Sequence, residues 1–356
     1  MRLKTIDYKD ERIIFSGRTL EIPGICARFF NWSGSGFTFK FIGTAASARF
    51  VIGSPSEVIP RDEEKAYIGV FVDGEIYETA RFALNANNGL YVLAENLPYG
   101  EHTVKVIKET EMWYGRAGLS ELCTDGDFIL PAHNRKKHIE FIGDSITCGY
   151  GNICSNGSSE FVTAEENFSN TYAAIAARQL DCDISVVAAS GNGFYRDYGC
   201  NTVNLIPELY ESTEKVFSGH CGVLPEKWNF ESDKCDAVVI KLGQNDGQYC
   251  SGADLKEEER SEELLLSRRK AFEERAYDFF MRIIAHRPDT PILFICEENM
   301  LLKPECLSAA ERTGRVETLV FAPKREYEGV GANGHYSVYT HARVAATLTQ
   351  RLKEIL

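Results

Sequence analysis

The sequence predicts a mixed α/β protein in which an N-terminal β-sandwich of jelly-roll type precedes a three-layer α/β/α domain with a parallel sheet. Two observations support this prediction. Short apolar runs separated by turn signals fill the first third of the chain, which is typical of a sandwich. After that, strand and helix patterns alternate, which is typical of βαβ units. The change in pattern divides the chain into domains at residues 1–130 and 131–356.

Short strands joined by tight turns are expected throughout the first domain. Asp73-Gly74 lies between two apolar runs and is a strong signal for a two-residue hairpin turn. No convincing helix pattern occurs before about residue 125, so this domain should be all β. The strands predicted here are 37–42, 47–52, 68–72, 75–77 and 100–108.

A polar linker over residues 131–137 leads into the part of the chain where strands and helices alternate. Ser169 is expected to cap a helix whose alanines favour helical structure. The charge run 256–260 is interpreted as the solvated start of a long helix. The predicted strands are 138–142, 183–189, 236–242, 291–296 and 316–321. The predicted helices are 169–181, 259–286, 305–313 and 338–355.

The composition is that of a globular protein, and the net charge argues against two classes of partner. Hydrophobic residues make up 44% of the chain and charged residues 26%. The formal net charge is −13, so no basic excess exists to meet phosphate groups. We therefore expect neither a nucleic-acid partner nor docking on an anionic membrane. The sequence leaves the oligomeric state open.

The N-terminal segment and the cysteines both favour a cytoplasmic protein. Residues 1–7 lack the apolar core of a signal peptide, and no stretch has the length of a transmembrane helix. The 11 cysteines are scattered, and free thiols in a reducing compartment are preferred over disulfides. Cys148 and Cys154 have no matching Cys/His pair that would complete a zinc site. We therefore expect neither a metal nor another cofactor.

The first candidate for chemistry is Ser145, in the segment Gly143-Asp144-Ser145. This segment directly follows a predicted strand, and open α/β sheets place their ligand crevice at the carboxyl ends of the strands. The glycine lets the chain turn sharply, so we interpret Ser145 as a nucleophile on a strand-to-helix turn. The alternative is a loop serine, with Asp144 as an ordinary helix N-cap.

Three further blocks are expected at the same edge of the sheet. They contain Gly191 and Asn245, each after a predicted strand, and His335, just before the last helix. His335 would take the proton of Ser145 and return it to the leaving alcohol. The N–H groups of Ser145 and Gly191 and the side-chain amide of Asn245 would bind the oxyanion. Together these groups are what an acyl-transfer reaction requires.

Each of these assignments has an alternative that the sequence leaves open. His341 could be the base, with His335 serving only to cap a helix. Gly193 could supply the N–H group in place of Gly191. Asn245 could do no more than form an Asx-turn.

The order of the four blocks resembles that of the SGNH, or GDSL-type, hydrolases over roughly residues 137–356. With a β-sandwich in front, the chain resembles more narrowly the family-two carbohydrate esterases. Segments 141–151, 190–196 and 228–230 are further similarities to that family. The resemblance implies a serine esterase that removes acetyl groups from sugar hydroxyls. Its partner would be an acetylated oligo- or polysaccharide, such as xylan or another plant glycan.

The resemblance also implies how the histidine is oriented. SGNH enzymes usually carry an aspartate three residues before the histidine, and this sequence has Ala332 at that position. The family-two esterases often work with a Ser–His dyad, in which a backbone carbonyl orients the histidine. The chain fits this variant, so Ser145 and His335 are expected to act without a carboxylate partner.

Substrate-binding residues are predicted among Asp144, Tyr195, Trp228 and Tyr336. The aromatic faces suit stacking on a sugar ring, although aromatic side chains more often belong to a core. Two functions compete with the carbohydrate esterase: an SGNH esterase or lipase acting on a non-carbohydrate ester, and a non-enzymatic glycan-binding protein. The β-rich first domain favours a carbohydrate ester because it can form one wall of an open cleft. The complete set of four site residues disfavours a non-catalytic protein.

Overall fold

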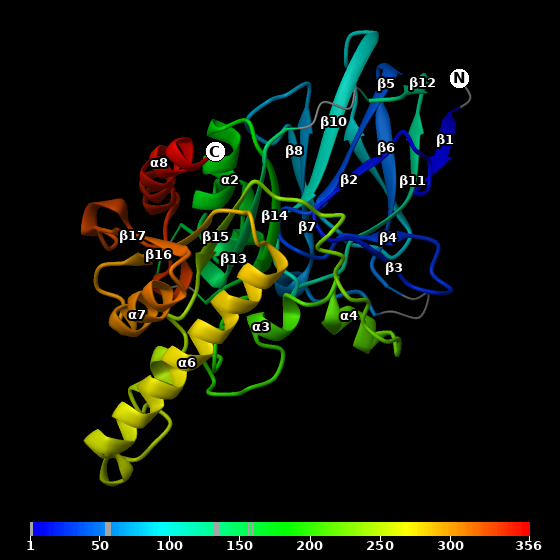
Figure 1. Ribbon diagram of the computed structural model, residues 1–356. Helices are drawn as coiled ribbons and strands as arrows, with labels where there is room; N and C mark the ends of the chain where they lie inside the picture. The colour runs from blue at the N-terminus through cyan, green and yellow to red at the C-terminus, as the bar shows by residue number, and fades with distance from the viewer. Residues whose placement is uncertain (1–2, 54–57, 132–135, 156, 158–159) are drawn as a thin grey trace.

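The computed structural model describes residues 3–53, 58–131, 136–155, 157 and 160–356. The chain folds into a β-sandwich followed by a layered α/β domain, which confirms the predicted fold class (Figure 1). The predicted division after residue 130 falls between strand β12 (Asp127–Ile129) and strand β13 (His138–Gly143). Of the predicted linker 131–137, residues 132–135 lie outside the described residues.

The first domain consists of two antiparallel sheets. Its strands are β1 (Lys4–Asp7), β2 (Ile14–Ser16), β3 (Leu20–Glu21), β4 (Arg28–Phe29), β5 (Gly36–Gly43), β6 (Ala46–Val51), β7 (Tyr67–Val72), β8 (Ala80–Ala83), β9 (Gly89–Ala94), β10 (Gly100–Lys108), β11 (Gly118–Thr124) and β12. One sheet has the order β3-β4-β11-β6-β9 with β1 beside β11, and the other has the order β12-β5-β10-β7-β8 with β2 beside β5. Phe37, Phe39 and Phe41 alternate along β5 and are fully buried in the core. The sandwich is confirmed, and its jelly-roll connectivity stays a prediction.

One predicted strand of this domain is wrong. Asp73 and Gly74 adopt the left-handed conformation that a tight turn requires, with φ angles of 54° and 80°. Residues 75–77, however, do not form the returning strand, because β7 pairs instead with β8. Thr79 closes this longer connection by donating its N–H and its hydroxyl to the carbonyl of Val70. The Asp-Gly signal located the turn but not the strand that follows it.

The second domain has a central sheet of five parallel strands in the order β14-β13-β15-β16-β17. The strands are β13, β14 (Asp183–Ala188), β15 (Ala237–Lys241), β16 (Ile292–Glu297) and β17 (Val316–Phe321). The helices are α1 (Ser145–Cys148), α2 (Tyr172–Gln179), α3 (Ile206–Leu209), α4 (Lys215–His220), α5 (Gly247–Cys250), α6 (Glu262–His286), α7 (Lys303–Thr313) and α8 (Val338–Ile355). All five predicted strands and all four predicted helices of this domain are present, with shifts at their ends.

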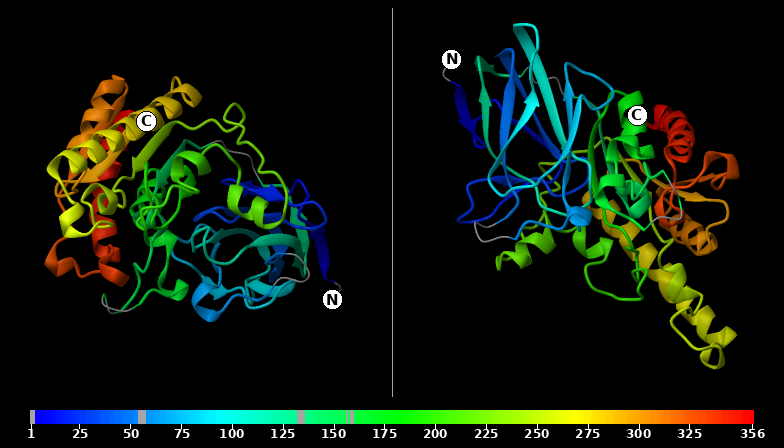
Figure 2. Two further views of the ribbon diagram at one scale, coloured as in Figure 1. Left: turned by 90° about the horizontal axis from the view of Figure 1, so that it is seen from below. Right: turned by 180° about the vertical axis from the view of Figure 1, so that it is seen from behind.

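Successive side chains of the strands point to opposite faces of the sheet, so each face buries a helix layer of its own. On one face, Ile142 of β13 lies in a core cluster with Phe272 of α6. On the other face, Phe141 lies in a cluster with Tyr172 of α2 and Val344 of α8. Figures 1 and 2 show α2 and α8 on one side of the sheet and α6 and α7 on the other. The predicted three-layer arrangement is therefore confirmed.

The start of α2 differs from the prediction that Ser169 caps it. The N-cap is Thr171, whose side chain accepts the N–H of Ala174. Ser169 lies in a preceding 3₁₀ turn and donates its N–H and its hydroxyl to Glu109 of the first domain, at 2.8 and 2.7 Å. The serine is therefore used for a contact between domains, which local sequence patterns do not report.

A buried charge network also joins the two domains. The fully buried carboxylate of Glu140, on β13, accepts hydrogen bonds from Arg18 of the first domain at 3.1 Å and from Arg287 at the end of α6 at 3.3 Å. Tyr210 donates its hydroxyl to the same carboxylate at 3.0 Å. Arg18 also donates to the carbonyls of Tyr210 and Ser212. One carboxylate therefore neutralises guanidinium groups from both domains.

Replacing Glu140 with alanine should destabilise the protein strongly, because the buried guanidinium of Arg18 would lose its counter-charge and Arg287 would keep only its pair with Asp233. Breaking a buried ion pair from one side costs about 3–5 kcal/mol. We expect the midpoint of thermal unfolding, measured by scanning calorimetry, to fall by at least about 5 °C. As a control, Glu101→Ala removes a partly exposed pair with Lys40 and should lower the midpoint by less than about 2 °C. Equal shifts in the two variants would contradict this account of the network.

Candidate active site

Ser145 is the first residue of α1, directly after β13. Asp144 caps this helix, since its carboxylate accepts the N–H of Ile146 at 3.0 Å. The turn needs a glycine at position 143, because a Cβ there would lie 2.0 Å from Oγ1 of Thr147. Ser145 is 6% exposed. The sequence signal Gly-Asp-Ser thus builds a tight strand-to-helix turn that presents the serine at the carboxyl edge of the sheet.

His335 is brought directly to Ser145 by the loop before α8. Its Nε2 lies 2.9 Å from Oγ of Ser145, and its Nδ1 lies 2.9 Å from the carbonyl oxygen of Ala332. A carbonyl can only accept a hydrogen bond, so Nδ1 carries the proton and the Nε2 lone pair faces the serine. Ala332 is fully buried against Gly151. The predicted acceptor for Nδ1, a main-chain carbonyl, is therefore where the resemblance placed it.

The alternative base, His341, lies elsewhere. It is buried in α8, and its Nδ1 accepts the N–H of Tyr172 at 3.1 Å. Burial lowers the pKa of His341 to about 3, so this imidazole stays neutral at ordinary pH. We interpret it as a cap of α2 within the core.

Each of the three predicted oxyanion donors has a hydrogen that could bind an oxyanion. The N–H groups of Ser145 and Gly191 have no acceptor within the described part of the chain. The Asn245 amide donates to the main-chain oxygen of Asn192 at 2.8 Å, which leaves its second hydrogen available. Gly191 is half-buried and left-handed, with a φ of 74°, whereas the alternative, Gly193, is buried against the Arg196 carbonyl and the Asp246 carboxylate.

Asp246 is a site-forming residue to which the sequence analysis gave no role. Its buried carboxylate accepts the N–H groups of Phe194, Tyr195 and Arg196 at 3.0, 2.8 and 2.7 Å. Burial raises the pKa of Asp246 to about 6. The carboxylate ties the loop after Gly191 to the start of α5, in the segment that follows β15. The sequence feature that could have indicated this role is the position of Asp246 shortly after a predicted strand.

Two further residues of the site come from the first domain, where the sequence analysis placed none. Glu111 accepts the N–H of Ser190 at 2.6 Å, and the indole N–H of Trp113 donates to the carbonyl of Ser190 at 3.2 Å. Trp113 and Gly191 line one cavity of about 480 Å³. The sandwich thus borders the same edge of the sheet as the four predicted blocks.

An aromatic wall flanks the histidine. The ring of Tyr150 lies 4.4 Å from the ring of His335, between centroids, and it stacks on Phe161 at 3.8 Å. Asn333 donates its side-chain amide to the Tyr150 hydroxyl at 3.2 Å. Tyr150 belongs to a segment that the sequence analysis quoted only as a similarity.

The structure does not support Asp144 or Tyr336 as substrate contacts. Asp144 is 1% exposed and serves as a cap, and burial raises its pKa. Tyr336 is 3% exposed and donates its hydroxyl to Glu297. Both side chains lie beneath the site, where the protein itself satisfies them.

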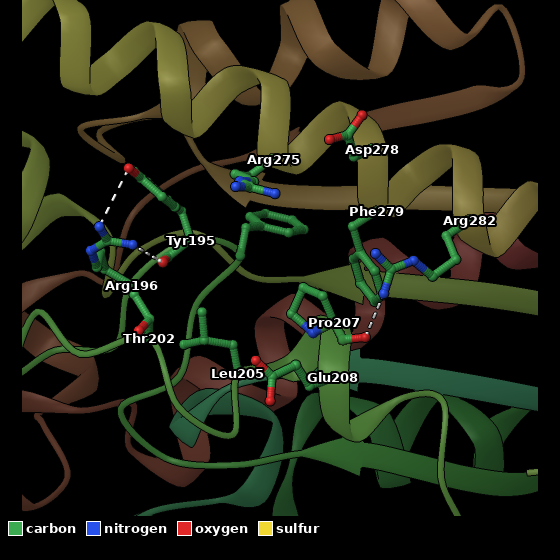
Figure 3. A pocket seen from close by; sticks show the side chains of 11 residues that line it. Tyr195, Arg196, Thr202, Leu205, Pro207, Glu208, Arg275, Asp278, Phe279 and Arg282 are labelled. Atoms are coloured by element: carbon green, nitrogen blue, oxygen red, sulfur yellow. Dashed lines mark hydrogen bonds between the residues drawn. The ribbon is translucent and has the colours of Figure 1, made fainter. Parts of the chain in front are cut away.

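Trp228 and Tyr195 also lie apart from the Ser145–His335 pair. The indole N–H of Trp228 donates to Asp233 at 3.2 Å, and its ring packs against Arg18 of the buried charge network. Tyr195 lines a separate cavity of about 270 Å³ with Arg196, Arg275 and Asp278 (Figure 3). Neither Ser145 nor His335 lines that cavity. These two aromatics therefore contribute to packing and to a neighbouring surface.

One group among the described residues has the spacing of metal ligands. Ligand atoms of Glu111, Cys148 and Glu166 lie within 4.8 Å of one another, and all three residues are buried. Burial raises the pKa of Glu111 to about 7 and raises the pKa values of Glu166 and Cys148 well above their ordinary values. This group therefore favours bound protons over the negative charge that a cation requires. The metal-free mechanism stays a prediction.

Comparisons with known sequences show which proteins this chain is similar to. A family model described as the N-terminal part of carbohydrate esterase 2 matches residues 16–132. The cellulase/esterase CelE of Acetivibrio thermocellus is 29% identical over 338 residues, which cover 91% of this chain and 37% of that protein. The chain thus spans little more than a third of the length of this relative.

Two solved structures have the same fold over almost the whole chain. A family two carbohydrate esterase from Clostridium thermocellum, in complex with cellohexaose, matches with a TM-score of 0.80 and 26% identity, covering 96% of this chain and 98% of that one. An acetyl xylan esterase from the rumen bacterium Butyrivibrio proteoclasticus matches with a TM-score of 0.83 and 18% identity, covering 99% and 98%.

The parallel sheet and the four blocks at its edge define an SGNH-type, or GDSL-like, hydrolase fold. Within this class, the chain is a relative of the family-two carbohydrate esterases, with the sandwich of that family before the SGNH domain. The predicted resemblance is confirmed. No helix within the described residues is long and apolar enough to cross a membrane.

The pKa of His335 should be measurable below that of an ordinary histidine. Burial disfavours the imidazolium and lowers this pKa below 6.5, against the opposing effect of the Ala332 carbonyl. His102 is the internal control, because its hydrogen bond to Asp73 raises its pKa above 6.5. In an NMR titration of the imidazole resonances, assigned with a His335→Asn variant, His335 should lose its proton at lower pH than His102. The reverse order would contradict this description of the site.

Proposed function

We propose that this protein is a serine esterase that removes acetyl groups from acetylated carbohydrates, with Ser145 and His335 as a dyad. The observation that carries the proposal is the line of groups from Ser145 through the imidazole to the Ala332 carbonyl, with 2.9 Å at each step. A nucleophile and a correctly oriented base, with spare N–H donors beside them, fit acyl transfer. The esterase names of the relatives support the same chemistry.

The first half of the reaction forms an acyl-enzyme. Oγ of Ser145 attacks the acetyl carbonyl carbon while Nε2 of His335 takes the hydroxyl proton. The N–H groups of Ser145 and Gly191 and the Asn245 amide bind the oxyanion that develops. When the intermediate collapses, the bond from the acyl carbon to the sugar oxygen breaks. His335 gives its proton to that oxygen, and the deacetylated hydroxyl leaves.

The second half repeats these steps with water. His335 takes a proton from a water molecule that attacks the acetyl-Ser145 ester, and the same donors bind the oxyanion. Collapse returns the proton to Oγ of Ser145 and releases acetate. The Ala332 carbonyl holds the imidazole throughout, but it stabilises the imidazolium less than a carboxylate would because it carries no full charge.

A carbohydrate substrate is supported by the open surroundings of the site and by the relatives. Half-buried Trp113 and exposed Tyr198 line the cavity beside Gly191, together with polar groups such as Asn201. Aromatic faces with nearby polar side chains suit a sugar ring. One relative with this fold was solved with cellohexaose, and another is named an acetyl xylan esterase. We therefore propose acetylated xylan or a similar plant glycan, as polymer or oligosaccharide.

The Ser145→Ala variant should lose esterase activity while keeping its fold. The change removes one oxygen atom, so packing is barely altered, and loss of a nucleophile lowers turnover by several orders of magnitude. Acetate release from acetylated xylo-, manno- and gluco-oligosaccharides should be compared with release from longer acyl esters. Wild-type protein that releases no acetate, or a folded variant with substantial activity, would overturn the proposal. A preference for long acyl chains would favour a lipase-like function.

The Asn245→Ala variant should lower kcat much more than it raises KM. The amide would act on charge that exists only in the transition state, and removal of one such donor lowers kcat by about 10²–10³-fold. Steady-state kinetics with an acetylated xylo-oligosaccharide would measure both constants. An unchanged kcat with a raised KM would instead assign Asn245 to substrate positioning.

A further inference from the structure

We propose that two residues of the first domain, Trp113 and Glu111, hold the main chain of Ser190 by hydrogen bonds and thereby fix the direction of the Gly191 N–H, one of the proposed oxyanion donors. We call this pair of contacts the clamp. The inference rests on the proposed function, because it assigns positioning residues to that site. Both side chains belong to the segment between β10 and β11, in the domain that carries none of the reacting groups.

The argument begins with the peptide unit that joins Ser190 to Gly191. Its two polar ends are the carbonyl of Ser190 and the N–H of Gly191, and in a planar trans peptide they point in opposite directions. Trp113 holds the carbonyl through its indole N–H at 3.2 Å. Fixing the carbonyl therefore fixes the N–H at the other end of the same unit.

The clamp is needed because the backbone at Gly191 can change conformation easily. Its φ of 74° lies in the region that glycine enters freely, so a reversal of the preceding peptide meets little steric resistance. A Cβ built on Gly191 would touch only Tyr198, at 3.8 Å, so packing around the glycine does not hold it. The Gly191 carbonyl accepts the N–H of Tyr198 at 2.7 Å, but this bond fixes the following peptide unit. The orientation of the 190–191 peptide therefore depends on the contacts at Ser190.

Glu111 supplies the second contact, at the preceding peptide. Its Oε2 accepts the N–H of Ser190 at 2.6 Å, a short hydrogen bond in a fully buried setting. Trp113 and Glu111 thus hold both polar main-chain groups of one residue. Two fixed groups leave the 190–191 peptide with a single orientation.

The clamp is itself rigid, because the segment that carries it is held by Lys108. The buried ammonium group donates to the carbonyls of Thr110, Glu111 and Tyr114, at 3.0, 2.6 and 3.0 Å. These three hydrogen bonds hold the main chain of residues 110–114 around one buried amino group. Glu111 and Trp113 therefore reach Ser190 from a fixed base in the first domain.

The test compares two tryptophan variants. Trp113→Phe keeps an aromatic ring and removes the indole N–H. We expect kcat for 4-nitrophenyl acetate to fall at least about 10-fold with KM little changed, because the Gly191 N–H would be misdirected, whereas complete loss of one oxyanion donor lowers kcat by about 10²–10³-fold. Trp32→Phe is the matched control. Its indole N–H also donates to a main-chain carbonyl of the other domain, that of Thr213 at 2.8 Å, a residue that belongs to none of the four blocks. This control should keep the wild-type kcat.

A pair of variants at Glu111 tests the second contact. Glu111→Gln keeps an acceptor for the Ser190 N–H and should retain kcat within about 3-fold, whereas Glu111→Leu has no acceptor and should lose about as much as Trp113→Phe. Thermal midpoints identify variants that fail to fold. Rescue by glutamine but not by leucine is a result that a merely space-filling role would not produce.

A second readout separates this inference from the proposed function. Diisopropyl fluorophosphate reacts with Ser145: an Oγ–P bond forms, the P–F bond breaks, fluoride leaves and the hydroxyl proton passes to His335. The same donors bind the phosphoryl oxygen, so Trp113→Phe should slow labelling as it slows turnover. If wild-type protein is labelled but releases no acetate, the proposed function fails while the labelling rates still test the clamp. Equal rates for wild type and Trp113→Phe, or equal losses in both tryptophan variants, would overturn the clamp.

Discussion

The buried ammonium group of Lys108 is the interaction on which the contact between the two domains at the site depends. A lysine without access to water needs every donor satisfied, and here three main-chain carbonyls serve that purpose. Burial lowers the pKa of Lys108 to about 7, so the buried charge is costly, and the three carbonyls are the contacts that offset this cost. From this segment Glu109 reaches Ser169 before α2, and Glu111 reaches Ser190 after β14.

The site itself is assembled by buried carboxylates that accept main-chain N–H groups. Asp144 caps the helix that begins with Ser145, Asp246 holds three N–H groups of the loop after Gly191, and Glu111 holds Ser190. A carboxylate with several acceptor positions can organise a loop that has no regular structure of its own. Acidic residues near the site thus act mainly on the backbone.

His335, in contrast, is oriented by a neutral main-chain carbonyl and not by a carboxylate. Asn333 and Gly334 take left-handed conformations, with φ angles of 49° and 74°, and this turn places the Ala332 carbonyl behind the imidazole. Ala332 is packed against Gly151, where a larger neighbour would not fit. In the proposed dyad, a tight turn and a small side chain would take the place of the carboxylate of a full triad. Burial keeps the pKa of the half-buried His335 below the ordinary value.

The local patterns of the sequence determined the five strands of the parallel sheet, the four longest helices of the second domain, and the four blocks at the sheet edge. Period-two and period-3.6 hydrophobic patterns and the Gly-Asp-Ser signal are properties of short segments, so they can be read without the fold. Parallel strands then oblige Ser145, Gly191 and Asn245 to meet at one edge. Only tertiary structure decided that Glu111 and Trp113 join this edge and that Tyr336 is buried away from it. These outcomes depend on contacts between residues far apart in the chain, and a side chain's partner across a domain interface leaves no local pattern.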